Sequence, residues 1–206
     1  MIDYNREYFY LNPDYQFPTL NNTQDSEGSL SELLRSQPVD VNKKRIQCFA
    51  KPIPPNPKLV DFHRVTVCTP AVSERLKTLL ESLNLENVQL LPVLIRDEKG
   101  VEHPGYYIVH VVNFIDCMDK ELSEWTPNLN KKGKASDIKK LILDNKKLDE
   151  IPLEKRLIFA LGEKRTNVLY HISVVEKILE IAPVGLTVSR LSKSDSSYPF
   201  IEEYMS

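Results

Sequence analysis

Asp116 and Asp119 are the residues of this sequence best suited to acid–base chemistry. They lie three positions apart, directly after the apolar run at residues 106–115. Two neighbouring carboxylates can serve as a general acid and a general base. Two aspartates after a strand are also common turn formers, because their side chains accept hydrogen bonds from nearby backbone N–H groups. We favour the turn, and keep as the alternative function an uncharacterised enzyme of hydrolase type that uses Asp116 or a histidine in a pocket.

Serine and histidine do not form a catalytic or metal-binding pattern. Ser73 is not part of a G-x-S-x-G motif, so a place at the start of a helix suits it better than the role of a nucleophile. No histidine has a second ligand at the short spacings of zinc sites. The four histidines are His63, His103, His110 and His171. We therefore predict no catalytic residues and no metal site.

Phosphate-binding glycine motifs are missing as well. Gly133 precedes Lys134, but the other residues of a P-loop are not there, and G-x-G-x-x-G does not occur. We predict that the protein uses no cofactor.

The composition describes a soluble globular protein with a weak net charge. Charged residues make up 27% of the 206 residues and hydrophobic residues 41%, and the formal net charge is −2. Because nucleic-acid binders are usually basic, we expect no nucleic-acid partner. The three cysteines, Cys48, Cys68 and Cys117, show no C-x-x-C spacing. They are typical of buried thiols in a reduced, cytoplasmic protein.

We expect one domain over residues 1–206, with neither a secretory signal nor a membrane span. Residues 1–60 are predicted to form an N-terminal strand and a proline-rich extension. Residues 61–206 are predicted to form the main α+β body.

The elements that must position these side chains are centred on residues 61–116. We predict a strand over 63–68, a helix over 70–83, and strands over 88–96 and 106–115. The run at 88–96 is so apolar that we expect it to be buried on both faces. The helix prediction depends on a stripe of leucines at helical spacing, namely Leu76, Leu79, Leu80 and Leu83.

A similar order of elements returns in the second half. We predict strands over 157–161, 168–172 and 186–191, and a helix that starts at the capping box formed by Ser173 and Glu176. At an offset of 99 positions, apolar residues of the two helices coincide. This repeat fits either a duplication or two similar strand–helix–strand units. The predicted fold is α+β, a mixed β-sheet with a few packed helices.

Aromatic side chains are the candidates for recognition. Because strand residues alternate between faces, one of Tyr106 and Tyr107 is expected in the core and the other is free to contact a partner. Trp125 can line a ligand groove or anchor a partner. Together with Asp116, these three aromatic residues are our candidate partner-binding residues.

Lysines concentrate in residues 131–147. Such a run can bind nucleic acid or an acidic partner, or can be an ordinary solvated surface. Asp137 and Asp144 dilute its charge, so we favour the solvated surface.

The chain resembles the bacterial immunity protein 11-like family of polymorphic toxin systems, formerly a domain of unknown function. The resemblance lies in residues 8–14, 18–22, 72–77, 79–80, 88–93 and 106–113, with Asp116, Ile172, Ser173 and Gly185. It implies a cytoplasmic protein that is not an enzyme and that binds and neutralises a cognate toxin encoded nearby. The family provides no catalytic residues, and the resemblance leaves the oligomeric state open.

Overall fold

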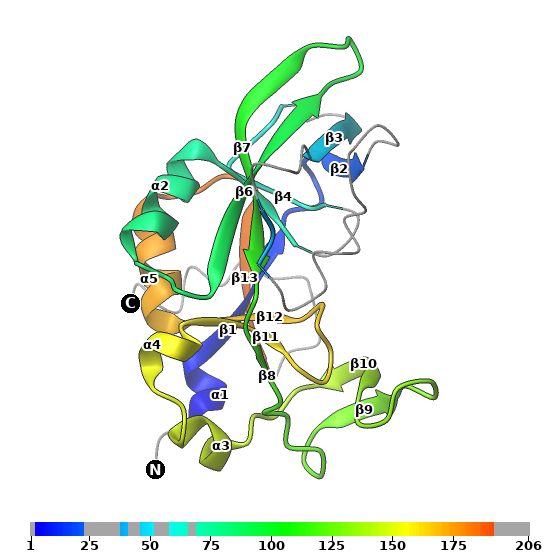
Figure 1. Ribbon diagram of the computed structural model, residues 1–206, viewed down its shortest axis with the longest axis vertical. Coiled ribbons are helices and arrows are strands. Elements are labelled where there is room, and N and C mark those ends of the chain that lie inside the picture. The colour runs from blue at the N-terminus through cyan, green and yellow to red at the C-terminus, as the bar shows by residue number, and fades with distance from the viewer. Residues whose placement is uncertain (1–2, 23–37, 41–45, 52–57, 66–68, 192–206) are drawn as a thin grey trace.

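The computed structural model describes residues 3–22, 38–40, 46–51, 58–65 and 69–191, which form two large β-sheets, a two-stranded sheet and five helices (Figure 1). The six-stranded sheet contains, in spatial order, β2 (Thr19–Asn22), β3 (Ile46–Lys51), β6 (Val88–Arg96), β7 (Glu102–Val111), β5 (Ala71–Ser73) and β4 (Phe62–His63). The five-stranded sheet contains β13 (Leu186–Arg190), β1 (Tyr8–Pro13), β12 (Val168–His171), β11 (Ile158–Leu161) and β8 (Phe114–Ile115). The two-stranded sheet contains β9 (Glu124–Pro127) and β10 (Ala135–Lys140). The helices are α1 (Tyr4–Glu7), α2 (Glu74–Ser82), α3 (Asn145–Asp149), α4 (Leu153–Arg156) and α5 (Ile172–Glu180).

Both large sheets are mixed. Neighbouring strands are antiparallel except for the pairs β3–β6 and β8–β11, which are parallel. The predicted α+β fold with a mixed sheet is therefore confirmed. Of the strand predicted over 63–68, His63 belongs to β4, and residues 66–68 lie outside the described residues.

The two strand–helix–strand units share one topology. In β5–α2–β6 the two strands are separated by β7, which is antiparallel to both. In β12–α5–β13 the strand between them is β1, again antiparallel to both neighbours. The helices α2 and α5 contact each other on the same side of the molecule (Figure 1). The predicted pair of similar units is confirmed. In each unit, a strand from another part of the chain lies between the two strands, β7 in the first and β1 in the second.

The first helix begins later than its leucine pattern predicts. We expected a helix over 70–83, but Ala71–Ser73 forms β5 and α2 begins at Glu74. Pairing with β7 holds this segment extended and outweighs its local tendency to form a helix. The Ser73 side chain accepts a hydrogen bond from the Leu76 N–H at 3.5 Å, so Ser73 caps the helix, as its predicted helix-start role implies.

The second helix has a different cap from the predicted one. Instead of Ser173, the N-cap of α5 is His171, whose Nδ1 accepts a hydrogen bond from the Ser173 N–H at 3.2 Å. The reason is that β12 passes into α5 without a turn, so the last strand residue takes the cap position.

Two strands also differ from expectation. The predicted burial of 88–96 on both faces is wrong: residues 88–90 are half-buried, and in the second half Leu91, Val93 and Ile95 are buried but Pro92 is exposed. This part of β6 and its hairpin partner β7 extend beyond the helices (Figure 1), so only one face is covered. The strand predicted over 106–115 is divided at residues 112–113, where the chain passes from β7 to β8 in the other sheet.

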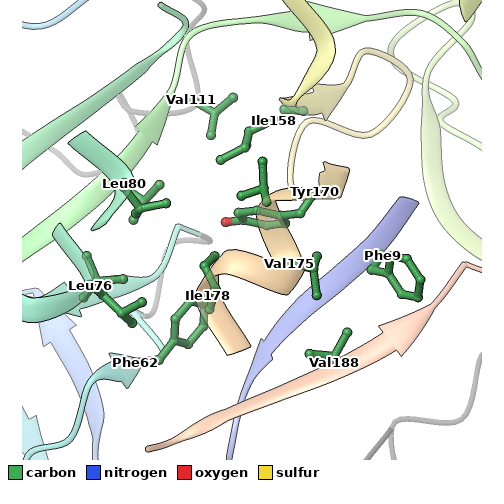
Figure 2. Close-up of a cluster of buried hydrophobic side chains, with 14 residues drawn as sticks. Phe9, Phe62, Leu76, Leu80, Val111, Ile158, Tyr170, Val175, Ile178 and Val188 are labelled. Carbon is green, nitrogen blue, oxygen red and sulfur yellow. The ribbon is translucent and has the colours of Figure 1, made fainter. Parts of the chain in front are cut away.

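The central core lies between the two helices and both large sheets. Figure 2 shows side chains from α2 and α5 that point toward side chains of the strands. The labelled residues are Phe9, Phe62, Leu76, Leu80, Val111, Ile158, Tyr170, Val175, Ile178 and Val188. Leu79 and Leu83 pack at its margin, so the predicted leucine stripe is the buried face of α2.

Asp61 joins the two sheets. Its N–H and that of Phe62 donate to the Val184 carbonyl at 3.1 and 3.2 Å, which ties β4 to the loop before β13. Its carboxylate accepts hydrogen bonds from Ser73 Oγ (2.7 Å), Arg75 Nη2 (2.6 Å) and the Val184 N–H (3.0 Å). Burial alone would raise the pKa of Asp61, but these hydrogen bonds outweigh it and hold the pKa below its ordinary value.

The chain passes very close to itself at this joint. Gly185, which follows Val184, has φ +87°, and a Cβ there would collide with the Val60 side chain and the Phe62 carbonyl oxygen. A residue other than glycine would therefore push β4 away from the start of β13.

Arg156 anchors the N-terminal segment to the lower half of the molecule. Its side chain is buried, and it donates from Nη1 to Tyr8 Oη at 2.9 Å and from Nη2 to Tyr4 Oη at 3.1 Å. Its Nε donates to the Ile151 carbonyl at 2.8 Å. The guanidinium also lies over the Tyr4 ring, 4.5 Å from the centroid. One side chain thus links α1, β1 and the segment between α3 and α4.

The substitution Asp61→Asn should destabilise the protein by about 2 kcal/mol at pH 7, because an amide oxygen accepts less strongly and its NH₂ group faces donors. The pKa of Asp61 is lower when folded, so the carboxylate stabilises the fold above its unfolded pKa, and this contribution is lost as the pH falls through the folded pKa. The free energies of urea unfolding of wild type and variant should therefore approach each other as the pH falls below about 4, and coincide only below the folded pKa of Asp61. A constant difference across pH would contradict this.

The substitution Arg156→Lys should destabilise the protein by about 2–3 kcal/mol, because an ammonium group cannot reproduce the guanidinium's three separate hydrogen bonds. The matched control is Lys155→Met, an exposed neighbour whose change should stay within about 0.5 kcal/mol. Urea unfolding followed by Trp125 fluorescence measures both. Equal stability of the two variants would show that the Arg156 contacts do not anchor the segment.

Candidate functional site

The two aspartates that suggested acid–base chemistry have separate structural partners. Asp116 is exposed, forms an ion pair with Lys134 Nζ at 2.9 Å, and lies so close to Gly162 that a Cβ there would collide with its carboxylate. Asp119 Oδ1 accepts hydrogen bonds from the backbone N–H groups of residues 121 and 122, both at 3.0 Å. Asp119 is therefore a turn former, as we favoured.

Histidines fill positions within the fold. His63 is buried, with Nε2 accepting from the Val60 N–H at 2.8 Å and Nδ1 lying 2.9 Å from the Pro18 carbonyl oxygen. These partners require the neutral ring with its proton on Nδ1, and burial lowers the pKa of His63 accordingly. His103 contacts Asp97 at 3.1 Å, and His110 is buried in β7. Within the described residues, no group of three or more His, Cys, Asp or Glu side chains is placed to hold a metal ion.

The cysteines agree with the predicted buried thiols where they are described. Cys48 and Cys117 are free and buried, and burial raises the pKa of both thiols, that of Cys48 to about 12. A thiol with so high a pKa is a poor nucleophile at neutral pH. Cys68 lies outside the described residues.

Tyr106 and Tyr107 lie on opposite faces of β7, as strand alternation predicts, but the expectation of one core tyrosine and one free tyrosine is wrong, because both are half-buried. The Tyr106 ring lies 5.8 Å from the His63 ring, centroid to centroid, and burial raises the pKa of Tyr106. On the other face, the Tyr107 hydroxyl donates to the Glu74 carboxylate, and Lys77 Nζ lies 5.0 Å from the Tyr107 ring centroid. Each tyrosine thus has one side on the fold and another toward solvent.

Trp125 lies in β9 and is half-buried against a second cluster of buried residues, separate from the central core. Its Nε1 donates to the Lys120 carbonyl at 3.1 Å. Trp125 and Asp116 belong to the end of the molecule that carries β8 and β9. The tyrosines of β7 belong to the six-stranded sheet at the other end (Figure 1). The structure therefore groups the four candidate residues into two separate pairs.

A groove of about 660 Å³ lies along β1, β12 and β13, between the segment that follows β4 and the strand β10. Polar side chains on its lining are already paired with one another. Asn12 Nδ2 donates to Ser189 Oγ at 2.9 Å, and Asn167 Nδ2 donates to Tyr10 Oη at 3.2 Å. Burial raises the pKa of Tyr10 to about 12, so its hydroxyl stays protonated.

An arginine–tyrosine pair lies at the margin of this groove. The Arg64 guanidinium lies 5.4 Å from the centroid of the Tyr15 ring, and Tyr15 is 60% exposed. Arginine and tyrosine are enriched among the residues that dominate protein–protein binding energies. The sequence did not single out this pair, because Tyr15 and Arg64 come together only when β1 and β4 are placed by the fold.

None of the helices in the described parts of the chain has the length and apolar character needed to cross a bilayer. No curated protein sequence matches the chain. A family model described as "Immunity protein family (Imm11)" matches residues 12–171. The match covers most of the chain, including the whole β5–α2–β6 unit, β7 and the strand β12. By this match, the chain belongs to the Imm11 family of immunity proteins.

Proposed function

We propose that this protein is an antitoxin that binds a cognate bacterial toxin, encoded beside it, and neutralises the toxin through a protein–protein interface. The observation that carries this proposal is the match to an immunity protein family over residues 12–171. The binding event itself, a cytoplasmic location and the absence of catalysis belong to the proposal.

The side-chain geometry supports binding rather than catalysis. The residues that suggested an enzyme have structural partners, as described above for Asp116, Asp119 and His63. In contrast, the surface offers exposed aromatic and cationic side chains of the kinds that anchor protein partners, such as Tyr15 and Arg64.

The sequence-derived candidates keep their place as proposed contact residues. A stable interface buries on the order of 800 Å² on each partner, about 20–30 residues, so Asp116 and Trp125 can belong to one interface with β10. Tyr106 and Tyr107 can contact the toxin only if the interface extends to the six-stranded sheet. In that case they are the first residues there that we propose as toxin contacts.

Co-expression with the neighbouring toxin gene tests the function. We expect growth to be restored and the two purified proteins to elute together at a 1:1 ratio, with Kd below about 100 nM, because inhibition by occlusion needs a long-lived complex.

Titration of this protein against a fixed amount of toxin, with protection as the readout, distinguishes a binding protein from an enzyme. A binder protects only at one molecule or more per toxin, because each toxin must be covered. Protection at a small fraction of the toxin concentration, without a complex, would instead indicate turnover, and Asp116→Asn would then test the hydrolase alternative. Failure to protect and to bind would refute the antitoxin proposal.

A further inference from the structure

The charged side chains that line the groove, among the described residues, all have the same sign. Among the described residues that line it, Arg64 and Lys139 are the charged ones, and both are cations. They come from different elements, Arg64 from the segment after β4 and Lys139 from β10. A concave surface lined by one sign of charge focuses its field and attracts groups of opposite sign.

These two cations differ from their neighbours in forming no ion pair within the described residues, although the charge of Lys139 contributes to lowering the pKa of Asp137. Lys134 and Lys164 form ion pairs with Asp116 and Asp137, each at 2.9 Å. Lys139 has no ion pair within the described part of the chain, and Arg64 contacts the face of the Tyr15 ring. Within the described residues, the groove therefore offers two cations that belong to no ion pair.

The positive surface continues beyond the groove. A neighbouring depression of about 780 Å³ shares Thr166 with the groove. Its lining includes the cations Lys131 and Arg165, besides Lys134 and Lys164, whose charges are paired with Asp116 and Asp137. The one carboxylate among its described lining residues, Glu163, is 2% exposed, and burial raises its pKa above the ordinary value. Because it is buried, Glu163 offers a partner almost no accessible carboxylate on this surface.

We propose that the groove is the toxin-binding site and that its occupant is an acidic segment of the toxin, whose carboxylates meet Arg64 and Lys139. This inference rests on the proposed function. The exposed Tyr15 ring gives such a segment an aromatic contact beside Arg64. Asn12 and Ser189 are hydrogen-bonded to each other, but the Asn12 amide has a second N–H and the accepting Ser189 hydroxyl has its own O–H, and these can donate to such a segment.

An acidic protein segment fits the charges better than a nucleic acid does. Binding to a duplex requires cations at the spacing of the phosphates along an extended track. The groove itself presents two cations, the exposed Asp116 and Asp137 lie beside the neighbouring depression's lysines, and the whole chain carries −2. Sparse cations with hydrogen-bonding groups between them suit carboxylates on a polypeptide.

Charge reversal of the two cations tests the proposal. Arg64→Glu and Lys139→Glu each reverse one exposed charge of the groove, and Lys99→Glu reverses an exposed lysine in the turn between β6 and β7 as the matched control. The probe is the catalytically inactivated product of the adjacent toxin gene, titrated calorimetrically at 50 and 300 mM salt. Arg64→Ala gives a milder variant, and circular dichroism verifies that every variant is folded.

We expect the two groove variants to bind at least about tenfold more weakly than wild type at low salt, and to lose most of the salt dependence, because the attraction is electrostatic. Lys99→Glu should bind as wild type does. Wild-type affinity in both groove variants would overturn the groove assignment while leaving the antitoxin function intact.

Two further outcomes would also refute the inference. If wild type itself fails to bind the toxin or to protect, the proposed function fails and the groove assignment fails with it. If the groove variants bind the toxin normally but lose retention of a labelled RNA or DNA duplex that wild type retains, the groove is a nucleic-acid site.

Discussion

A single carboxylate joins the two halves of this protein. Asp61 accepts hydrogen bonds from the cap of α2, from Arg75 and from the backbone before β13, while its own N–H continues the contact to Val184. The central core needs both helices and both sheets in place, so it depends on this joint. Because the carboxylate is mostly buried, its charge is tolerated only with all three donors present, and the position of β4 relative to β13 is thereby narrowly defined.

Periodic patterns were the reliable part of the sequence. The leucine stripe of α2 and the apolar run at 88–96 led to the correct elements, since both reflect the face that each element buries. Boundaries set by tertiary contacts were missed. Ala71–Ser73 falls within the predicted helix yet pairs with β7, and the residues at 112–113 transfer the chain between sheets without a strong turn signal. The cap of α5 was missed because His171 is both the last strand residue and the cap.

Prediction from sequence was more limited for the candidate site than for the fold. Motif searches find chemistry only when its residues are close in sequence, and Asp116 with Asp119 was such a case, resolved into an ion pair and a turn. The groove is assembled from Tyr15, Arg64 and Lys139, which no spacing rule connects and which only the sheet order brings to one surface. Family resemblance could indicate an immunity function, but the residues that would perform it follow from topology.

The insertion of β1 between β12 and β13 has a consequence for synthesis on the ribosome. Within the described residues, this strand precedes the other strands of its sheet in the chain and pairs with β12 and β13, which are made more than 150 residues later. The pairing of β1 in the five-stranded sheet is therefore non-local and occurs late in synthesis. Until β12 and β13 have been made, β1 has no strand to pair with in this sheet. The groove includes residues of all three of these strands, so it is completed only once translation has passed residue 191. A nascent chain that ends before residue 191 thus has no finished groove.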